Sequence, residues 1–148
     1  MGTGPASTPT SSSSQDGRLR LLVAEDSPAV VEEIVSLLEP TYHVLRTVRN
    51  GVALVETASE LRPDVVVSDF AMPELNGIEA GKKILQKGLC RAVILLTMYN
   101  DAQLIGAAVD AGIAGYVLKA DAGEELIPAV QRVAGGERYF SRGIAGAQ

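Results

Sequence analysis

Short apolar runs alternate with longer segments of helical periodicity along most of the chain, and this alternation limits the fold more than any other feature. Strands that read as nearly continuous apolar runs are typical of parallel sheets buried on both faces. We expect five such strands, the second being the weakest, at residues 19–24, 43–48, 65–68, 92–96 and 115–118. The pattern predicts an α/β fold with a doubly wound, five-stranded parallel sheet in the order 2-1-3-4-5, a flavodoxin-like (βα)5 arrangement.

Capping residues mark the starts of several expected helices. Ser27 and Pro28 suit the N-cap and the first position of the helix after the first strand. Asn100 is expected to cap the fourth helix, and Asp121 with Glu124 resembles a capping box for the fifth.

The two ends of the chain differ in composition from its middle. Residues 1–17 are rich in Ser, Thr, Gly and Pro and offer little to bury, so we expect a flexible tail there. Residues 18–136 are expected to form one domain, and residues 137–148 a C-terminal tail or a truncated linker. The core of that domain should be aliphatic, because 47% of the residues are hydrophobic and only 4% are aromatic.

Composition also indicates the cellular compartment and excludes some classes of partner. The formal net charge of −5 argues against a broad nucleic-acid-binding surface. Cys90 is the only cysteine, so no intrachain disulfide can form, which fits a reducing compartment. The sequence has no apolar stretch of membrane-spanning length and no signal-peptide pattern at its start. We therefore expect a cytoplasmic protein that itself contacts neither nucleic acid nor membrane.

Chemically active side chains stand at the ends of four of the five expected strands. They are Glu25 and Asp26 after the first strand, Asp69 after the third, Thr97 after the fourth and Lys119 after the fifth. In the expected strand order these four strands are neighbours, and ligands bind at the carboxyl ends of the strands in such sheets. The sequence therefore predicts one pocket that holds three carboxylates, a hydroxyl and an ammonium group.

Three carboxylates in one pocket repel each other, and a hard cation removes that cost. Mg²⁺ prefers oxygen ligands and is usually held by one or two carboxylates together with phosphate. We expect Asp26 and Asp69 to be direct ligands, Glu25 to act through a water molecule, and the backbone carbonyl of Ala71 to complete the protein's share.

The same pocket suits phosphoryl transfer to an aspartate. The Asp69 carboxylate can act as a nucleophile and carry a phosphoryl group as an acyl phosphate. Lys119 and Thr97 would then contact the phosphoryl oxygens with a positive charge and a hydrogen bond. Alternatively, Lys119 could pair with Asp69 only as a structural salt bridge.

Four more residues belong with this set: Met72, Pro73 and Gly77 after Asp69, and Tyr116 in the fifth strand. The whole set, in this order and at these spacings, resembles the receiver domain of bacterial two-component response regulators. The resemblance extends over about residues 19–136, which is the whole expected domain.

This resemblance implies a signalling function switched by phosphorylation. A sensor histidine kinase, or a small donor such as acetyl phosphate, would phosphorylate Asp69. Thr97 would shift toward the phosphoryl group and Tyr116 would rotate inward, which would change the surface formed by the fourth helix, the fifth strand and the fifth helix. That surface would bind a partner or a second copy of the chain. Ala71 and Tyr99 would tune the lifetime of the phosphoryl group.

The segment around residues 119–126 resembles the subgroup that usually carries a helix-turn-helix DNA-binding domain after the receiver. The 148 residues leave no room for that domain, so a truncated piece and a stand-alone receiver are both open. Ala120 stands where the family usually has proline. The Lys119–Ala120 peptide bond is therefore expected to be trans, or else a costly cis bond.

Two other functions are weighed against the receiver. A magnesium-dependent phosphatase with an aspartate nucleophile usually has a second aspartate two residues later as its acid/base, and Ala71 occupies that position. A phosphorylation-independent interaction or dimerisation module would be a degenerate receiver, yet every member of the acidic, Thr and Lys set is present. The leading expectation is a signalling module that is not an enzyme, apart from catalysing its own phosphorylation and dephosphorylation.

Overall fold

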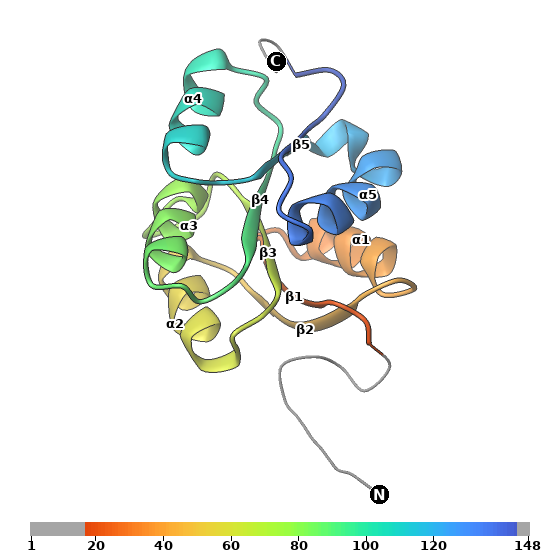
Figure 1. The fold of residues 1–148 in the computed structure, drawn as a ribbon, viewed down its shortest axis with the longest axis vertical. Helices are drawn as coiled ribbons and strands as arrows, with labels where there is room; N and C mark the ends of the chain where they lie inside the picture. Colours follow the sequence, from red (N-terminus) through yellow and green to blue (C-terminus); the bar gives the residue numbers. More distant parts are fainter. Residues whose placement is uncertain (1–16, 145–148) are drawn as a thin grey trace, which may run out of the picture.

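The computed structural model describes residues 17–144, in which strands and helices alternate along the chain (Figure 1). The elements are β1 (Arg20–Ala24), α1 (Pro28–Leu38), β2 (His43–Val48), α2 (Gly51–Leu61), β3 (Val65–Asp69), α3 (Gly77–Gln86), β4 (Ala92–Thr97), α4 (Ala102–Asp110), β5 (Gly115–Leu118), the 3-10 turn η2 (Lys119–Asp121), α5 (Ala122–Ala134) and β6 (Tyr139–Phe140). The expected tail at residues 1–17 lies outside the described residues, except for its last residue.

The strands form one parallel sheet in the order β2-β1-β3-β4-β5-β6. The expected order of the first five strands is confirmed, but the expected count of five is wrong. Tyr139–Phe140 adds a sixth strand beside β5, where the Tyr139 N–H donates to the Ala114 carbonyl at 2.9 Å and the Ser141 N–H to the Tyr116 carbonyl at 2.9 Å. A strand of two residues has no periodicity to read, so the pattern of the sequence could not reveal it.

Helices cover both faces of the sheet, with α2, α3 and α4 on one side and α1 and α5 on the other (Figure 1). Successive side chains of a strand point to opposite faces, so each central strand contributes side chains to two apolar layers. On β1, Leu22 packs in the layer under α2–α4, and Leu21 and Val23 pack in the layer under α1 and α5. All residues of β3 and β4 are buried, which explains their continuous apolar sequence. Among the described helices, none has the length and apolar character needed to cross a membrane.

One expected helix cap is replaced, and two others keep their position without a side-chain capping bond. The N-cap of α4 is Asp101, whose carboxylate accepts from the Gln103 N–H at 2.8 Å, and not Asn100. Both residue types cap helices well, so the sequence alone leaves a one-residue ambiguity, and the charge of Asp101 also suits the positive end of the helix dipole. Asp121 makes no side-chain capping bond, because η2 leads directly into α5. Ser27 occupies the expected N-cap position of α1 but likewise makes no side-chain capping bond.

The segment that follows α5 stays packed on the domain as far as Ile144, which is 6% exposed. The Asn100 side chain donates to the Gly143 carbonyl at 2.6 Å, and the Ser141 hydroxyl accepts from the Leu118 N–H at 2.9 Å. These contacts attach residues 139–144 to the β4–α4 loop and to β5, although composition placed them in a tail or linker.

The thiol of Cys90 should react slowly in the native protein. Cys90 is half-buried before β4, its Sγ donates to the Ala92 carbonyl at 3.3 Å, and burial raises its pKa to about 12. Because the thiolate is the reactive form, alkylation by iodoacetamide at mildly alkaline pH should be on the order of 10³-fold slower than in the unfolded chain. Mass spectrometry of the native and the guanidinium-unfolded protein measures both rates. Equal rates would show that the thiol is neither buried nor perturbed.

Candidate functional site

The carboxylates of Glu25, Asp26 and Asp69 converge at the carboxyl ends of β1 and β3. An oxygen atom from each lies within 4.8 Å of the others. Glu25 and Asp69 are 1% and 7% exposed, whereas Asp26 faces solvent. The parallel sheet produces this cluster, because Ala24 and Ser68, which precede the acidic residues, are paired across β1 and β3. The convergence expected from the sequence is therefore present.

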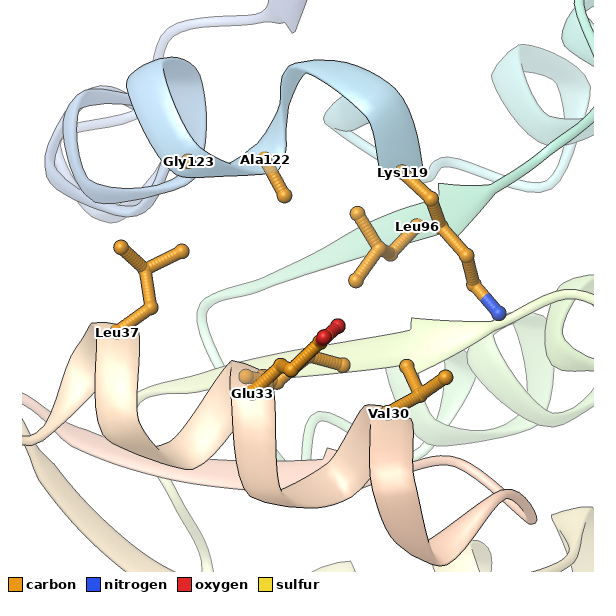
Figure 2. A pocket seen from close by; sticks show the side chains of 8 residues that line it. Val30, Glu33, Leu37, Leu96, Lys119, Ala122 and Gly123 are labelled. Atoms are coloured by element: carbon orange, nitrogen blue, oxygen red, sulfur yellow. The ribbon is translucent and has the colours of Figure 1, made fainter.

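Lys119 joins the two buried carboxylates. Its Nζ atom lies 3.0 Å from Glu25 Oε1 and 3.4 Å from Asp69 Oδ2. The side chain starts at η2, directly after β5, and extends across the end of the sheet (Figure 2). The peptide bond to Ala120 is trans, since no cis peptide bond occurs between residues 17 and 144. Lys119 therefore contacts both buried carboxylates, and its shorter contact is with Glu25.

Burial and neighbouring charge set the ionisation of this site. Burial and the Glu25 carboxylate raise the pKa of Asp69, and Lys119 offsets part of that rise. Burial by itself lowers the pKa of Lys119, but its hydrogen bond to Glu25 and the charge of Asp69 outweigh burial, and the net change is upward. The ammonium group thus stays charged between two carboxylates that repel each other.

Three carboxylates and one ammonium leave an excess of negative charge, which is the donor chemistry that suits a hard divalent cation. Both oxygens of Glu25 already have contacts, since Oε1 faces Lys119 and Oε2 accepts from the Ser27 N–H at 3.2 Å. Asp26 is exposed and Asp69 is next to it, so these two carboxylates are the more available to a cation. Ala71 is exposed in the loop that follows Asp69.

Thr97, Tyr99 and Tyr116 are connected through the backbone of Tyr99. The buried Thr97 hydroxyl accepts from the Tyr99 N–H at 3.1 Å, and the Tyr116 hydroxyl donates to the Tyr99 carbonyl at 2.8 Å. The Tyr116 side chain is 1% exposed and so already lies inward in this structure. Burial and the Asp101 charge raise the pKa of Tyr116 to about 12, despite the lowering by Thr97. The Tyr99 ring is about half exposed and packs edge-to-face on Phe70.

Ser68 lies at the site but was not predicted from the sequence. Ser68 is completely buried on β3, and its hydroxyl donates to the Asp69 carbonyl at 2.8 Å. A small polar residue inside an apolar strand gives no signal by itself, because its partner can only be identified in the folded structure.

A groove of about 410 Å³ adjoins the site between α1 and the start of α5 (Figure 2). Val30, Leu37 and Leu96 line it with apolar side chains, and Glu33 and Lys119 are its charged residues. The groove offers too few oxygen atoms to hold a hard cation, so the metal-binding chemistry belongs to the strand ends beside it.

The sequence matches a known family over most of its length. Residues 21–131 match the response regulator receiver domain. Among curated proteins, the transcriptional regulatory protein LnrK of Bacillus subtilis (strain 168) is 35% identical over 120 residues, which cover 80% of this chain and 54% of LnrK. The transcriptional regulatory protein MctR of Rhizobium johnstonii is 32% identical over 129 residues, covering 86% of this chain and 60% of MctR. The chain thus spans little more than half the length of these relatives.

Solved structures agree with this match. A two-component response regulator of the LuxR family from Aurantimonas sp. SI85-9A1 superposes with a TM-score of 0.81 at 31% identity, covering 86% of this chain and 92% of that one. The isolated REC domain of RcsB from Salmonella enterica serovar Typhimurium, solved with the phosphomimetic BeF3-, superposes with a TM-score of 0.76 at 27% identity and covers 84% of this chain and 94% of that one.

The family match, the parallel sheet and the acidic cluster at its edge all agree, and the resemblance noted from the sequence is confirmed. The chain belongs to the response regulator receiver domain family of two-component systems, whose members are phosphorylation-dependent signalling modules.

Proposed function

We propose that this domain accepts a phosphoryl group on Asp69 from a sensor histidine kinase, with the help of Mg²⁺. The observation that carries the proposal is the position of Asp69, a largely buried carboxylate beside two other acidic side chains and 3.4 Å from the Lys119 ammonium. Asp26 and Asp69 would hold the cation directly, Glu25 through water, and Ala71 through its backbone carbonyl.

In this reaction an oxygen of Asp69 forms a bond to phosphorus while the bond from phosphorus to the donor breaks. The donor atom is an imidazole nitrogen of the kinase or the bridging oxygen of acetyl phosphate, and it keeps the bonding electron pair. Lys119 balances negative charge on the phosphoryl oxygens, and Thr97 can turn its hydroxyl from the Tyr99 N–H to donate to one of them. When bound, Mg²⁺ would neutralise charge shared by the carboxylates and the phosphoryl group.

The signal would leave the site through Thr97 and Tyr116. In this structure the Thr97 hydroxyl accepts from the Tyr99 N–H. New negative charge on Asp69 would attract that hydroxyl. Since Tyr116 donates to the carbonyl of that same residue, a movement of Thr97 changes the surface formed by α4, β5 and α5. Ala71 and Tyr99 are exposed near the acceptor and would set how easily water reaches the acyl phosphate.

The output would be the control of a partner, a second copy of the chain or a DNA-binding domain through the α4–β5–α5 surface. Two curated relatives are named transcriptional regulatory proteins and are longer than this chain, which supports a role in transcription. DNA contact would then fall to another domain, because this chain is acidic. Family membership supports a cytoplasmic setting.

Incubation with acetyl phosphate and Mg²⁺ should add the mass of one phosphoryl group to the intact protein. Asp69→Asn should remove this gain without loss of the fold, because the substitution removes the nucleophile and keeps the shape of the side chain. A chelator should also prevent the gain. Intact-mass spectrometry measures all three samples, and an undiminished gain in Asp69→Asn would refute the assignment of the acceptor.

Metal titration should separate the role of Lys119 from that of Asp26. Asp26→Ala should weaken Mg²⁺ binding by at least roughly 10-fold, because it removes a ligand. Lys119→Ala should retain Mg²⁺ binding and slow phosphorylation, since it removes only a positive charge. Lys82→Ala, on the exposed face of α3, is the matched control. Tyrosine fluorescence can follow the titration, and an equal loss of affinity in Lys119→Ala would contradict the division of roles.

The raised pKa of Asp69 has a consequence for stability without metal. The pKa of Asp69 is higher in the folded than in the unfolded chain. The free energy of unfolding therefore falls as the pH rises from the unfolded pKa through the folded pKa and Asp69 ionises. At neutral pH, Asp69→Asn should be more stable than the original protein by on the order of 1 kcal/mol. In acid, where Asp69 is neutral in both states, that difference should vanish. Urea unfolding at both pH values measures it, and a less stable variant at neutral pH would contradict this account.

A further inference from the structure

The loop of residues 70–76, between β3 and α3, is held at both ends by glycines that begin helices. Gly77 is the first residue of α3, and a Cβ atom there would overlap the Asp69 carbonyl oxygen and lie 3.0 Å from the carbonyl carbon. Gly51 is the first residue of α2, and a Cβ atom there would overlap the Leu75 carbonyl oxygen and lie 2.6 Å from Leu75 Cβ. At Gly77 the backbone of Asp69, and at Gly51 the backbone of the loop, occupies the space that a side chain would need.

The other glycines in the described helices lack this contact with the loop. A Cβ atom at Gly81, also on α3, would lie 3.2 Å from a side-chain atom of Val93 and would meet no backbone. At Gly106 on α4 and Gly123 on α5, a Cβ atom would have nothing within 4 Å. The close backbone approach therefore occurs where α2 and α3 begin, at the two ends of the loop that carries Ala71.

Hydrogen bonds fix the same part of the backbone. The Ser68 hydroxyl donates to the Asp69 carbonyl at 2.8 Å, and the Gly77 N–H donates to the Phe70 carbonyl at 2.8 Å. The Asp69 carbonyl is thus confined by a hydroxyl and by the Cα of Gly77. A shift of this carbonyl would also move the Asp69 side chain, because both belong to the same residue.

We propose that Gly77 and Gly51 are positioning residues for the acceptor site. They keep the 70–76 loop against α2 and α3, so that the Asp69 carboxylate stays 3.4 Å from the Lys119 ammonium and the loop backbone that includes Ala71 keeps its place. This inference rests on the proposed function of Asp69. A misplacement of about 1 Å at a reacting group can slow a reaction by as much as 10²-fold. A methyl group at position 77 forces a movement of this kind, because the atom it meets is backbone.

Four Gly→Ala variants test the proposal. Gly77→Ala and Gly51→Ala introduce the methyl group against the loop, Gly81→Ala introduces it in α3 against side chains only, and Gly106→Ala introduces it into open space. Each variant is assayed for its maximal rate of phosphorylation at saturating acetyl phosphate and Mg²⁺, for its Mg²⁺ affinity and for its unfolding in urea. We expect a rate at least roughly 10-fold lower in Gly77→Ala. Gly51→Ala should lower both the Mg²⁺ affinity and the maximal rate, but less than Gly77→Ala does, because its methyl group meets Leu75, at the end of the loop away from Asp69 and Ala71. Gly81→Ala and Gly106→Ala should keep the original rate and affinity.

The urea measurement separates positioning from general destabilisation. A purely structural role would make the rates follow stability, so Gly81→Ala would then lose as much rate as Gly77→Ala at equal stability, and that result would overturn the proposal. Original rates and affinities in folded Gly77→Ala and Gly51→Ala would also overturn it. If Gly77→Ala does not fold, Ser68→Ala replaces it, because that variant removes the hydrogen bond to the Asp69 carbonyl without adding volume. Ser68→Ala should then be several-fold slower, and an unchanged rate would count against the proposal.

Failure of the proposed function gives a different result. An original protein that takes no phosphoryl group would contradict the role of Asp69 as acceptor, and the Mg²⁺ affinities of the same variants would still decide whether the two glycines position the site. An original protein that binds neither Mg²⁺ nor a phosphoryl group would contradict both.

Discussion

The contact of Lys119 with Glu25 and Asp69 is the interaction on which the rest of the site depends. Two buried carboxylates at the end of a parallel sheet would each suffer a desolvation cost and repel one another. The ammonium group 3.0 Å from one and 3.4 Å from the other lets both stay close to each other. The arrangement still carries excess negative charge because Asp26 adjoins it, and this excess is the donor chemistry that suits a divalent cation.

The sheet supplies the geometry for this contact. β1, β3, β4 and β5 are neighbours and run parallel, so residues that are far apart in the sequence arrive at one edge. This is why the main site residues could be predicted from the sequence: each stands directly after an apolar run, and the strand order follows from the alternation of strands and helices. The prediction of Asp69 and Lys119 as neighbours needed only the topology and no knowledge of side-chain packing.

Other features could not be predicted, for identifiable physical reasons. The strand Tyr139–Phe140 is too short to have a period, and the choice of Asp101 over its neighbour as the α4 cap depends on where the helix begins. The close approach of backbone atoms to Gly51 and Gly77 joins segments that are distant in the sequence, so no local pattern encodes it. The contacts of Thr97 with Tyr99 likewise depend on the conformation of the β4–α4 loop.

Other contacts link the β4–α4 loop, which begins after Thr97, to the segment that follows β6. Tyr116 donates from its side chain to Tyr99, and its backbone carbonyl accepts from Ser141, which lies just after β6. Asn100, in the β4–α4 loop, donates to the carbonyl of Gly143. The segment of residues 139–144 is therefore attached by hydrogen bonds both to β5 and to the loop that follows Thr97.

The central claim is that Asp69 is the residue that becomes phosphorylated. The most direct measurement is chemical trapping: the protein is treated with acetyl phosphate and Mg²⁺, reduced with borohydride, and mapped by peptide mass spectrometry. Reduction converts an aspartyl phosphate to homoserine and so marks the acceptor itself. The account predicts homoserine at position 69 and at no other acidic residue. Homoserine at position 26, or at any carboxylate outside the site, would contradict it.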